Sequence, residues 1–271
     1  MGYRNIMNLL WISLPICVLL RALQLVFTID STTGFVKQQY SEISVIISFI
    51  VCAAIAAITL LAFIAYGVDL KFYAVKPPVA VSSALLGGMF IYETLYAISS
   101  LTAGSWRDIL LILLSFLSAI AFALYAVRSV YFYKMPYMIL VAPVAYYIVK
   151  IIDIFVSTSS LALVTENIFL IFTNSALLWF MFEFASYENG MGDIFKSHKK
   201  LFASGVASIS LCTVTALPKF ILFVSNKAEV SQDDLSASLL TAAVGIFVLF
   251  YTKYTFGRRK IREKQIAKHL A

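Results

Sequence analysis

Long apolar segments separated by short polar connections give this 271-residue chain its pattern. Each segment holds about 20 mostly apolar residues, the length that an α-helix needs to cross the roughly 30 Å hydrocarbon core of a bilayer. Eight helices are predicted, at residues 6–28, 43–66, 79–101, 109–127, 137–157, 161–184, 201–225 and 235–252. The fifth and sixth are the hardest to separate, because the connection 158–160 is short and uncharged.

Composition supports this interpretation. Hydrophobic residues make up 61% of the chain and charged residues 13%, whereas soluble domains average about 25% charged residues. We therefore predict an all-α transmembrane bundle, with residues 1–256 as a single transmembrane domain and residues 257–271 as a basic cytoplasmic tail. The first segment carries Arg21 and is followed by no clear small-residue cleavage site, so we expect a retained helix rather than a signal peptide.

The distribution of Lys and Arg predicts the orientation of the chain, since basic residues resist translocation. Of the 21 basic residues, fifteen fall in the N-terminal residues, the even-numbered connections and the tail. Three fall in the odd-numbered connections and three inside the predicted helices. Both termini are therefore predicted to lie in the cytoplasm, with the protein in the cell membrane.

The net charge of +7 comes mainly from the tail and the cytoplasmic connections. We expect its partners to be anionic lipid headgroups rather than nucleic acid, because each basic residue near such a surface contributes about 1 kcal/mol of binding. The alternative is that these residues serve only as a topology signal.

Charged residues inside the apolar segments are the best candidates for function, because each costs roughly 2.5 to 3.5 kcal/mol on insertion scales. Counted at 1.5 Å per residue, they fall in one layer in the outer half of the membrane, and their formal charges sum to zero. Gln24, Tyr96 and Tyr147 lie beside them at helical spacing. The charged members of this candidate polar site are Arg21, Glu93, Lys150, Asp153, Glu166 and Lys219.

The second, fourth and eighth predicted helices carry nothing more polar than Ser, Thr, Tyr or Gly. We therefore expect the first, third, fifth, sixth and seventh helices to surround a polar interior, and the other three to face lipid. Leu114 and Val248 would then contact lipid.

Two functions fit the polar layer. One is binding or transport of a small molecule or ion through a site that opens outward. Pro143 and Pro218 would support it, since each frees the carbonyl four residues earlier to line a cavity. The alternative is a non-catalytic structural or partner- and lipid-interacting membrane protein whose ion pairs only stabilise the bundle. Lys150 and Asp153 would then neutralise each other at i,i+3 spacing.

Enzymatic function is disfavoured, although it stays open. The two histidines, His198 and His269, fall in polar segments, so no HExxH zinc motif or intramembrane Ser-His pair is formed. Cys17, Cys52 and Cys212 lie in separate apolar segments without CxxC spacing and are expected to be buried thiols. We therefore predict no catalytic residues, no metal and no cofactor.

Residues 20–25 (Leu-Arg-Ala-Leu-Gln-Leu), 29–30 (Ile-Asp) and 32–35 (Thr-Thr-Gly-Phe) carry a resemblance to a known group of sequences. They resemble the first helix and following loop of uncharacterised polytopic membrane proteins of clostridial (Firmicutes) bacteria. The resemblance covers 16 residues, and its sharpest part is the Thr-Gly-Phe turn. It implies a bacterial cytoplasmic membrane and no particular activity.

Overall fold

The structure, a computed structural model, describes residues 2–28, 40–65, 68–70, 77–99, 106–131, 136–157, 164–190, 194–224 and 232–258. Within these residues, eight helices are long and apolar enough to span a membrane, which confirms the predicted all-α multi-pass bundle. Their bounds are α1 (Tyr3–Thr28), α2 (Ser41–Phe63), α3 (Pro77–Ser99), α4 (Trp106–Tyr131), α5 (Val141–Ser157), α6 (Val164–Glu188), α7 (Ile194–Val224) and α8 (Gln232–Thr255).

Helix ends mostly fall within four residues of the prediction, and α5 and α6 are separate helices. The one exception is the start of α7. A 3-10 turn, η2 (Tyr137–Leu140), precedes α5. Helix α7 begins seven residues earlier than expected and takes in Lys196 and His198. Apolar patterning marks the part of a helix that lies in hydrocarbon, so it misses polar turns that continue beyond it.

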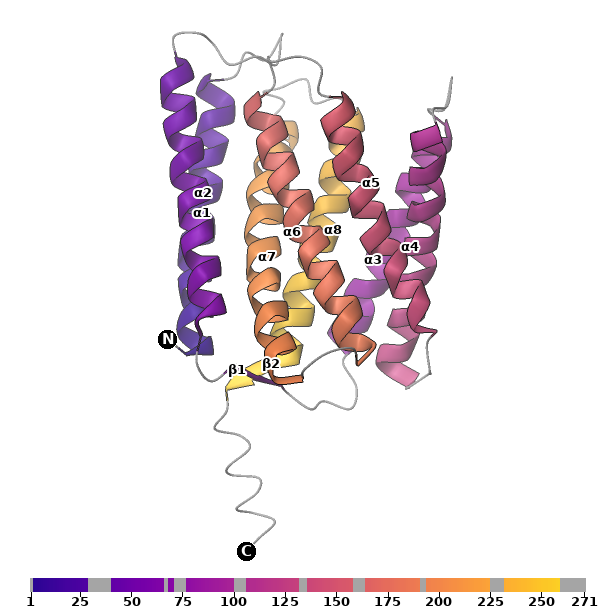
Figure 1. The fold of residues 1–271 in the computed structure, drawn as a ribbon. Coiled ribbons are helices and arrows are strands. Elements are labelled where there is room, and N and C mark those ends of the chain that lie inside the picture. Colours follow the sequence, from indigo (N-terminus) through magenta and orange to yellow (C-terminus); the bar gives the residue numbers. More distant parts are fainter. Residues whose placement is uncertain are drawn as a thin grey trace, which may run out of the picture.

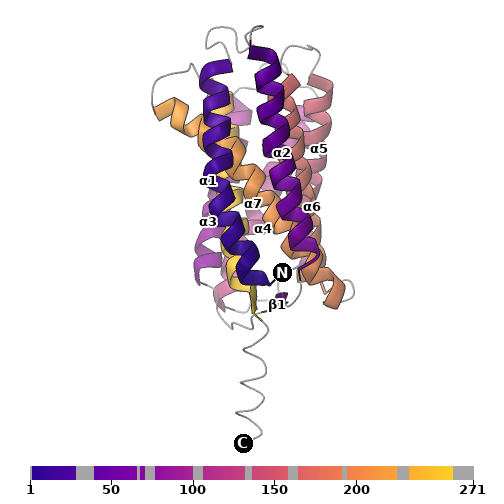
Figure 2. The ribbon, with the colours of Figure 1, turned by 90° about the vertical axis from the view of Figure 1, so that its left-hand side faces the viewer.

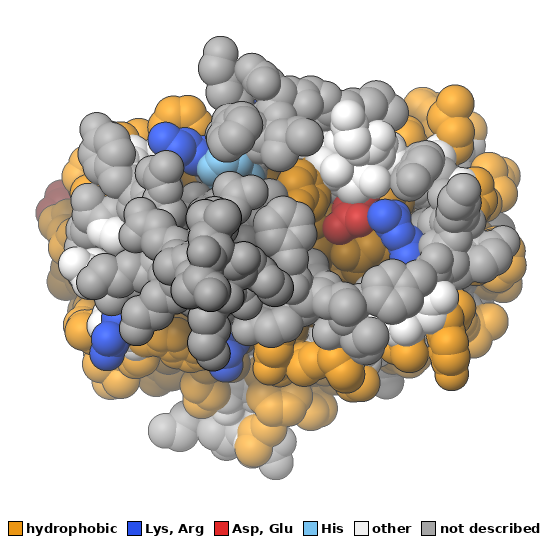
Figure 3. All heavy atoms as spheres, turned by 90° about the horizontal axis from the view of Figure 1, so that it is seen from below, with side chains coloured by type: hydrophobic (Ala, Val, Ile, Leu, Met, Phe, Trp, Pro, Cys, Tyr) orange, Lys and Arg blue, Asp and Glu red, His pale blue; other side chains and the backbone are white. Residues whose placement is uncertain are grey.

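The helices run alternately up and down in Figure 1. We call the end at which α1 begins the lower end, and the end at which α2, α4, α6 and α8 begin the upper end. Seen from the lower end, hydrophobic side chains form much of the outer rim (Figure 3). Such a rim suits contact with lipid.

Six helices form a closed ring. From α3 to α8 each helix packs against the next, and α8 returns to pack against α3. Helices α1 and α2 pack on each other and on α7, as a hairpin outside the ring. Figures 1 and 2 show this hairpin covering one side of the bundle beside α7. Because α7 packs against both the hairpin and the ring, it is the most deeply buried helix, and residues 201–212 are buried throughout.

Two short strands join the lower ends of distant segments. Strand β1 (Val68–Leu70) pairs antiparallel with β2 (Phe256–Arg258), so that Val68 lies opposite Arg258 and Leu70 opposite Phe256. The pairing holds the end of α8 against the segment that follows α2. Three-residue strands are too short to show an alternating pattern, and the sequence did not predict them. Residues 259–271 of the predicted tail lie outside the described residues.

Small residues bring α7 and α8 close together. A Cβ atom at Gly245 would lie 2.9 Å from the Cβ of Cys212, and one at Gly205 would lie 2.7 Å from Oγ1 of Thr252. Small side chains are a general means of close helix packing in membranes, where burial of apolar surface drives association only weakly.

Helix α3 meets α4 in a similar way. A Cβ at Gly87 would lie 3.2 Å from the carbonyl oxygen of Ala119. One turn below, the hydroxyl of Ser83 donates a 2.7 Å hydrogen bond to the carbonyl of Phe122. A hydroxyl that bonds to a neighbouring helix strengthens the contact where lipid offers no competing partner.

The prediction that the fourth and eighth helices face lipid is wrong. Both line the ring, with Phe122 of α4 and Phe247 and Tyr251 of α8 fully buried. Val248 is also buried, and Leu114 packs against the core. Polarity does not mark burial in a bilayer, because an inner helix face made of aromatic residues is as apolar as one that contacts lipid.

Aromatic rings fill the lower half of the ring's interior. Phe184 packs edge-to-face on Tyr251 with centroids 5.0 Å apart, and Phe122 packs on Phe247 at 5.1 Å. Phe180 lies beside Phe184 at 6.0 Å. Each such pair contributes about 0.5 to 1.5 kcal/mol beyond its buried area. The lower half of the ring is thus closed by packed side chains.

Candidate functional site

The interior of the ring becomes polar toward the upper end. Glu93 projects from α3 and Lys150 and Asp153 from α5, each within about two turns of the upper end of its helix. Arg107, which the sequence placed in a connection, lies in the first turn of α4. Three adjacent helices of the ring therefore supply two acidic and two basic side chains to one region.

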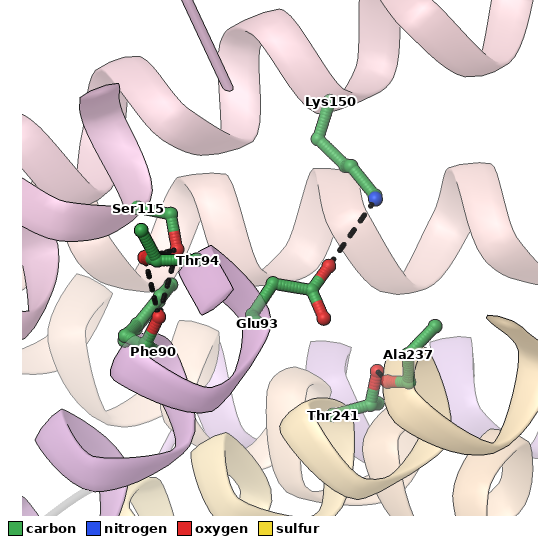
Figure 4. Close-up of polar contacts among 7 residues, drawn as sticks. All are labelled: Phe90, Glu93, Thr94, Ser115, Lys150, Ala237 and Thr241. Atoms are coloured by element: carbon green, nitrogen blue, oxygen red, sulfur yellow. Dashed lines mark hydrogen bonds and ion pairs between the residues drawn. The ribbon is translucent and has the colours of Figure 1, made fainter. Parts of the chain in front are cut away.

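Glu93 and Lys150, which we call the central pair, point toward each other from α3 and α5 (Figure 4). The distance from Nζ of Lys150 to Oε1 of Glu93 is 3.8 Å. Hydrogen bonds between nitrogen and oxygen measure roughly 2.7 to 3.2 Å, so this is an ion pair without a hydrogen bond. The other carboxylate oxygen, Oε2 of Glu93, is buried and has no hydrogen-bond partner among the described residues.

Hydroxyl groups near the central pair donate elsewhere. Thr241 of α8 lies on the side of the Glu93 carboxylate in Figure 4, but its hydroxyl donates a 2.7 Å hydrogen bond to the carbonyl of Ala237. Thr94 and Ser115 donate to a main-chain carbonyl on α3, at 2.7 and 3.0 Å. The described hydroxyl groups therefore leave this carboxylate oxygen without a donor.

The second ion pair joins α4 to α5. Arg107 Nη1 lies 3.4 Å from Asp153 Oδ1. The prediction that Lys150 pairs with Asp153 on its own helix is therefore wrong, because Lys150 pairs with Glu93. Neighbouring helices offer each of these side chains an opposite charge, and the packing of α3 and α4 against α5 decides the partners.

Tyrosines of α5 lie beneath the central pair. Tyr146 and Tyr147 are buried and lie close enough to Glu93 to interact with it electrostatically. Their rings pack edge-to-face at 5.3 Å, and Phe90 packs on Tyr146 at the same distance. Tyr147, a predicted site residue, thus forms part of an aromatic floor under the charges. Tyr96 instead stacks on the exposed Tyr92 with centroids 6.3 Å apart, at the edge of this region.

Two further predicted site residues lie outside the ring. Arg21 donates a 2.6 Å hydrogen bond to Gln24, and its guanidinium lies 4.2 Å from the ring centroid of Phe169 on α6. The Gln24 amide nitrogen donates at 2.8 Å to the carbonyl and hydroxyl of Ser44 and to the hydroxyl of Ser48 on α2. This hairpin cluster fastens α1 to α2 and the hairpin to the ring.

Glu166 and Lys219 complete the predicted set. Glu166 lies in the first turn of α6, and its side chain is outside the described residues. Lys219 follows Pro218 near the upper end of α7 and is partly buried. The expectation for Pro143 is wrong. It lies in the first turn of α5, and the carbonyl that it would free, at Ile139, accepts a hydrogen bond at the end of η2.

A cluster at the lower end was missed from the sequence. The carboxylate of Glu188 on α6 accepts 3.0 Å hydrogen bonds from the hydroxyls of Tyr125 and Tyr251. Its second oxygen lies 3.2 Å from Nη2 of Arg128. We call these four residues the lower cluster; in Figure 3 acidic and basic side chains meet in a hollow of this face. Glu188 lies past the predicted end of the sixth helix, although Tyr125 and Arg128 at i,i+3 spacing were a usable signal.

The chain matches no protein-family model, no curated protein and no solved structure in the comparisons made. Its function therefore has to be inferred from the chemistry inside the ring. That chemistry consists of two pairs of opposite charges with one unused carboxylate oxygen between α3, α5 and α8.

Proposed function

We propose that this multi-pass membrane protein binds a small polar solute inside the ring, at Glu93 and Lys150, and transports it across the membrane. The unused oxygen of Glu93 is the observation that carries the proposal. Leaving a buried acceptor unsatisfied costs about 1 to 3 kcal/mol, and more for a charged group. A solute that donates a hydrogen bond to this oxygen would remove that cost.

The other polar clusters of the molecule support a binding site over a structural ion pair. In the hairpin cluster Gln24 of α1 donates to Ser44 and Ser48 of α2 at 2.8 Å, and in the lower cluster Glu188 accepts from two tyrosine hydroxyls and pairs with Arg128. Both clusters connect helices with short contacts. The central pair has one long contact and a vacant oxygen, which is a poor way to hold two helices together.

Exposure of the charges supports access from the upper end. The side chains of Arg107, Asp153 and Lys150 are 25%, 28% and 29% exposed, and that of Glu93 is 14% exposed. A charge exposed to hydrocarbon without water is strongly disfavoured. We therefore infer that water reaches these side chains, with Glu93 at the inner end of the path.

The proposal also includes the orientation of the protein in the membrane and the membrane in which it lies. Exposed basic residues at the lower end favour a cytoplasmic position there, next to anionic lipid headgroups. The resemblance of the first helix and loop favours a bacterial cytoplasmic membrane. These lower-end residues are Arg4, Lys199, Lys200 and Lys253.

In the structural alternative, the central pair only stabilises the bundle, as the hairpin and lower clusters do. Water would then not reach Glu93. Cysteine labelling tests it in a variant whose three native cysteines are replaced by Ala, reconstituted in nanodiscs. A cysteine at Thr241, beside Glu93, should react with a membrane-impermeant thiol reagent. A cysteine at Phe116, exposed on the outer face of α4, should not, because lipid covers it. Protection of the Thr241 position in the folded protein, with labelling after denaturation, would support the structural alternative.

A further inference from the structure

The charges around the unused oxygen restrict the class of solute. Glu93 and Asp153 are balanced by Lys150 and Arg107, so these four side chains together carry no net charge. A solute with a net charge would bring an uncompensated charge into a region of low dielectric constant, where it is penalised heavily. A solute that carries one charge of each sign, or none, avoids this penalty.

The two ends of the central pair offer different chemistry. Oε2 of Glu93 is a buried acceptor, and Tyr146 and Tyr147 lie close enough to Glu93 to interact with it electrostatically. Acceptor oxygens and aromatic faces are the groups that bind an ammonium ion. Lys150 carries three N–H donors and makes no hydrogen bond within the described parts of the chain. Such an ammonium group suits a carboxylate.

Given the proposed function, we infer that the solute is a small zwitterion, with its ammonium group on Oε2 of Glu93 and its carboxylate on Nζ of Lys150. Insertion of such a molecule exchanges one long ion pair for two short ones and leaves the net charge unchanged. The 3.8 Å separation already lacks a hydrogen bond that insertion would have to break.

A metal ion fits this position less well. In the residues that the structure describes, no three His, Cys, Asp or Glu side chains gather as a ligand set. The Lys150 ammonium beside Glu93 would also repel a cation that brings no anionic group of its own.

Thermal unfolding of the purified protein at pH 7 tests the inference. The probes are glycine, β-alanine and 4-aminobutyrate, three zwitterions of increasing charge separation, with ethylammonium chloride and sodium acetate as their separate halves. At least one zwitterion should raise the unfolding midpoint by about 5 °C or more at saturating concentration. The two halves, alone or mixed, should give less than a third of that shift.

Variants test whether the shift of the unfolding midpoint depends on Glu93. Glu93→Gln should abolish the shift, whereas Glu188→Gln, the same substitution in the lower cluster, should lower the starting midpoint and keep the shift. Should Glu93→Gln fail to fold, the double variant Glu93→Lys with Lys150→Glu keeps the region neutral and should keep a zwitterion shift, because the solute can bind reversed.

Three results would overturn the inference. One is the absence of a shift with all three zwitterions, and another is an equal shift with either half alone. The third is a zwitterion shift that survives Glu93→Gln. A Glu93-dependent shift from the uncharged probes urea or glycerol alone would exclude a zwitterion and keep the proposed binding function. Protection of Thr241→Cys from the thiol reagent would count against the proposed function itself, independently of these shifts.

Discussion

Two glutamates show how one residue type takes different roles in this molecule. Glu93 and Glu188 both follow a tyrosine, Glu93 near the upper end of α3 and Glu188 at the last residue of α6. Glu188 uses both oxygens, because α4 and α8 present hydroxyls and a guanidinium to it. Glu93 has one long contact with Lys150. The difference comes entirely from the helices opposite, so the local sequence around either residue does not reveal it.

Replacing Glu188 with Gln should destabilise the protein. The substitution removes the charge that balances Arg128 and weakens two tyrosine hydrogen bonds, a loss of roughly 1 to 3 kcal/mol for a partly exposed pair. We expect the thermal unfolding midpoint in detergent to fall by several degrees. Tyr251→Phe, which removes the hydrogen bond to Glu188, should cost about 1 kcal/mol. A wild-type midpoint for Glu188→Gln would show that the lower cluster does not hold the ring.

Glu93→Gln should lower the same midpoint less than Glu188→Gln does. The wild-type carboxylate already has an unsatisfied oxygen, and the partly exposed Lys150 that remains can be hydrated. The pair of variants is matched in chemistry, so the comparison isolates the role of each position. If Glu93→Gln were the more destabilising of the two, the central pair would be structural and the proposed site would lose its main support.

At the scale of elements, close approach of helices depends on a few small residues. The pairs Gly245 with Cys212 and Gly205 with Thr252 lie on one seam between α7 and α8. Such a seam holds only while no side chain intrudes, because the Cβ positions are fixed by the backbones.

Gly245→Ala should destabilise the protein by about 1 to 3 kcal/mol, since its Cβ would lie 2.9 Å from that of Cys212 and the helices would have to separate. This sign is opposite to the preference of helices for Ala over Gly. Adding Cys212→Gly, which removes the opposing Cβ, should restore part of the loss. Gly88→Ala is the control, because a Cβ there meets nothing within 4 Å. Equal unfolding midpoints for Gly245→Ala and Gly88→Ala would mean that the seam tolerates a methyl group.

Apolar patterning was sufficient to find the eight helices, because hydrocarbon requires long uninterrupted apolar segments. It failed for Lys196 and His198, which continue α7 past the apolar region. It also failed for Val248 and Phe122, since a buried apolar face and a lipid-facing one have the same composition. The charged positions of α3 and α5 were found from their cost in hydrocarbon, but their pairing was not. Which helix lies opposite Lys150 is a property of packing that a helical wheel does not contain.

At the scale of the whole molecule, the ring and the hairpin are held in place by different contacts. The ring closes on itself, whereas the hairpin packs on α7 and is fastened by the hairpin cluster. The hairpin is therefore attached to the ring mainly through one helix, α7.

Gln24→Ala should destabilise the hairpin and leave the stability of the ring unchanged. It removes the acceptor of Arg21 and the amide that bonds to Ser44 and Ser48, at a cost of about 2 to 3 kcal/mol. Hydrogen exchange followed by mass spectrometry should show faster exchange in α1 and α2 with α3 to α8 unchanged. Ser13→Ala, which removes only a local bond to the carbonyl of Leu10 on α1, is the control. Uniform acceleration across all eight helices would mean that hairpin and ring unfold as one unit.

The closure of the ring by α8 also has a consequence for biosynthesis. Helix α8 packs against α3 and carries the strand that pairs with β1, so the contacts that complete the ring join segments made far apart in time. At about 5 to 20 residues per second, roughly 10 to 30 s separate the emergence of α3 from that of α8. Throughout this interval the Glu93 face of α3 has no α8 beside it. The nascent chain must therefore wait in the membrane with an open flank, where an insertion chaperone or the translocon itself would be in a position to shield it.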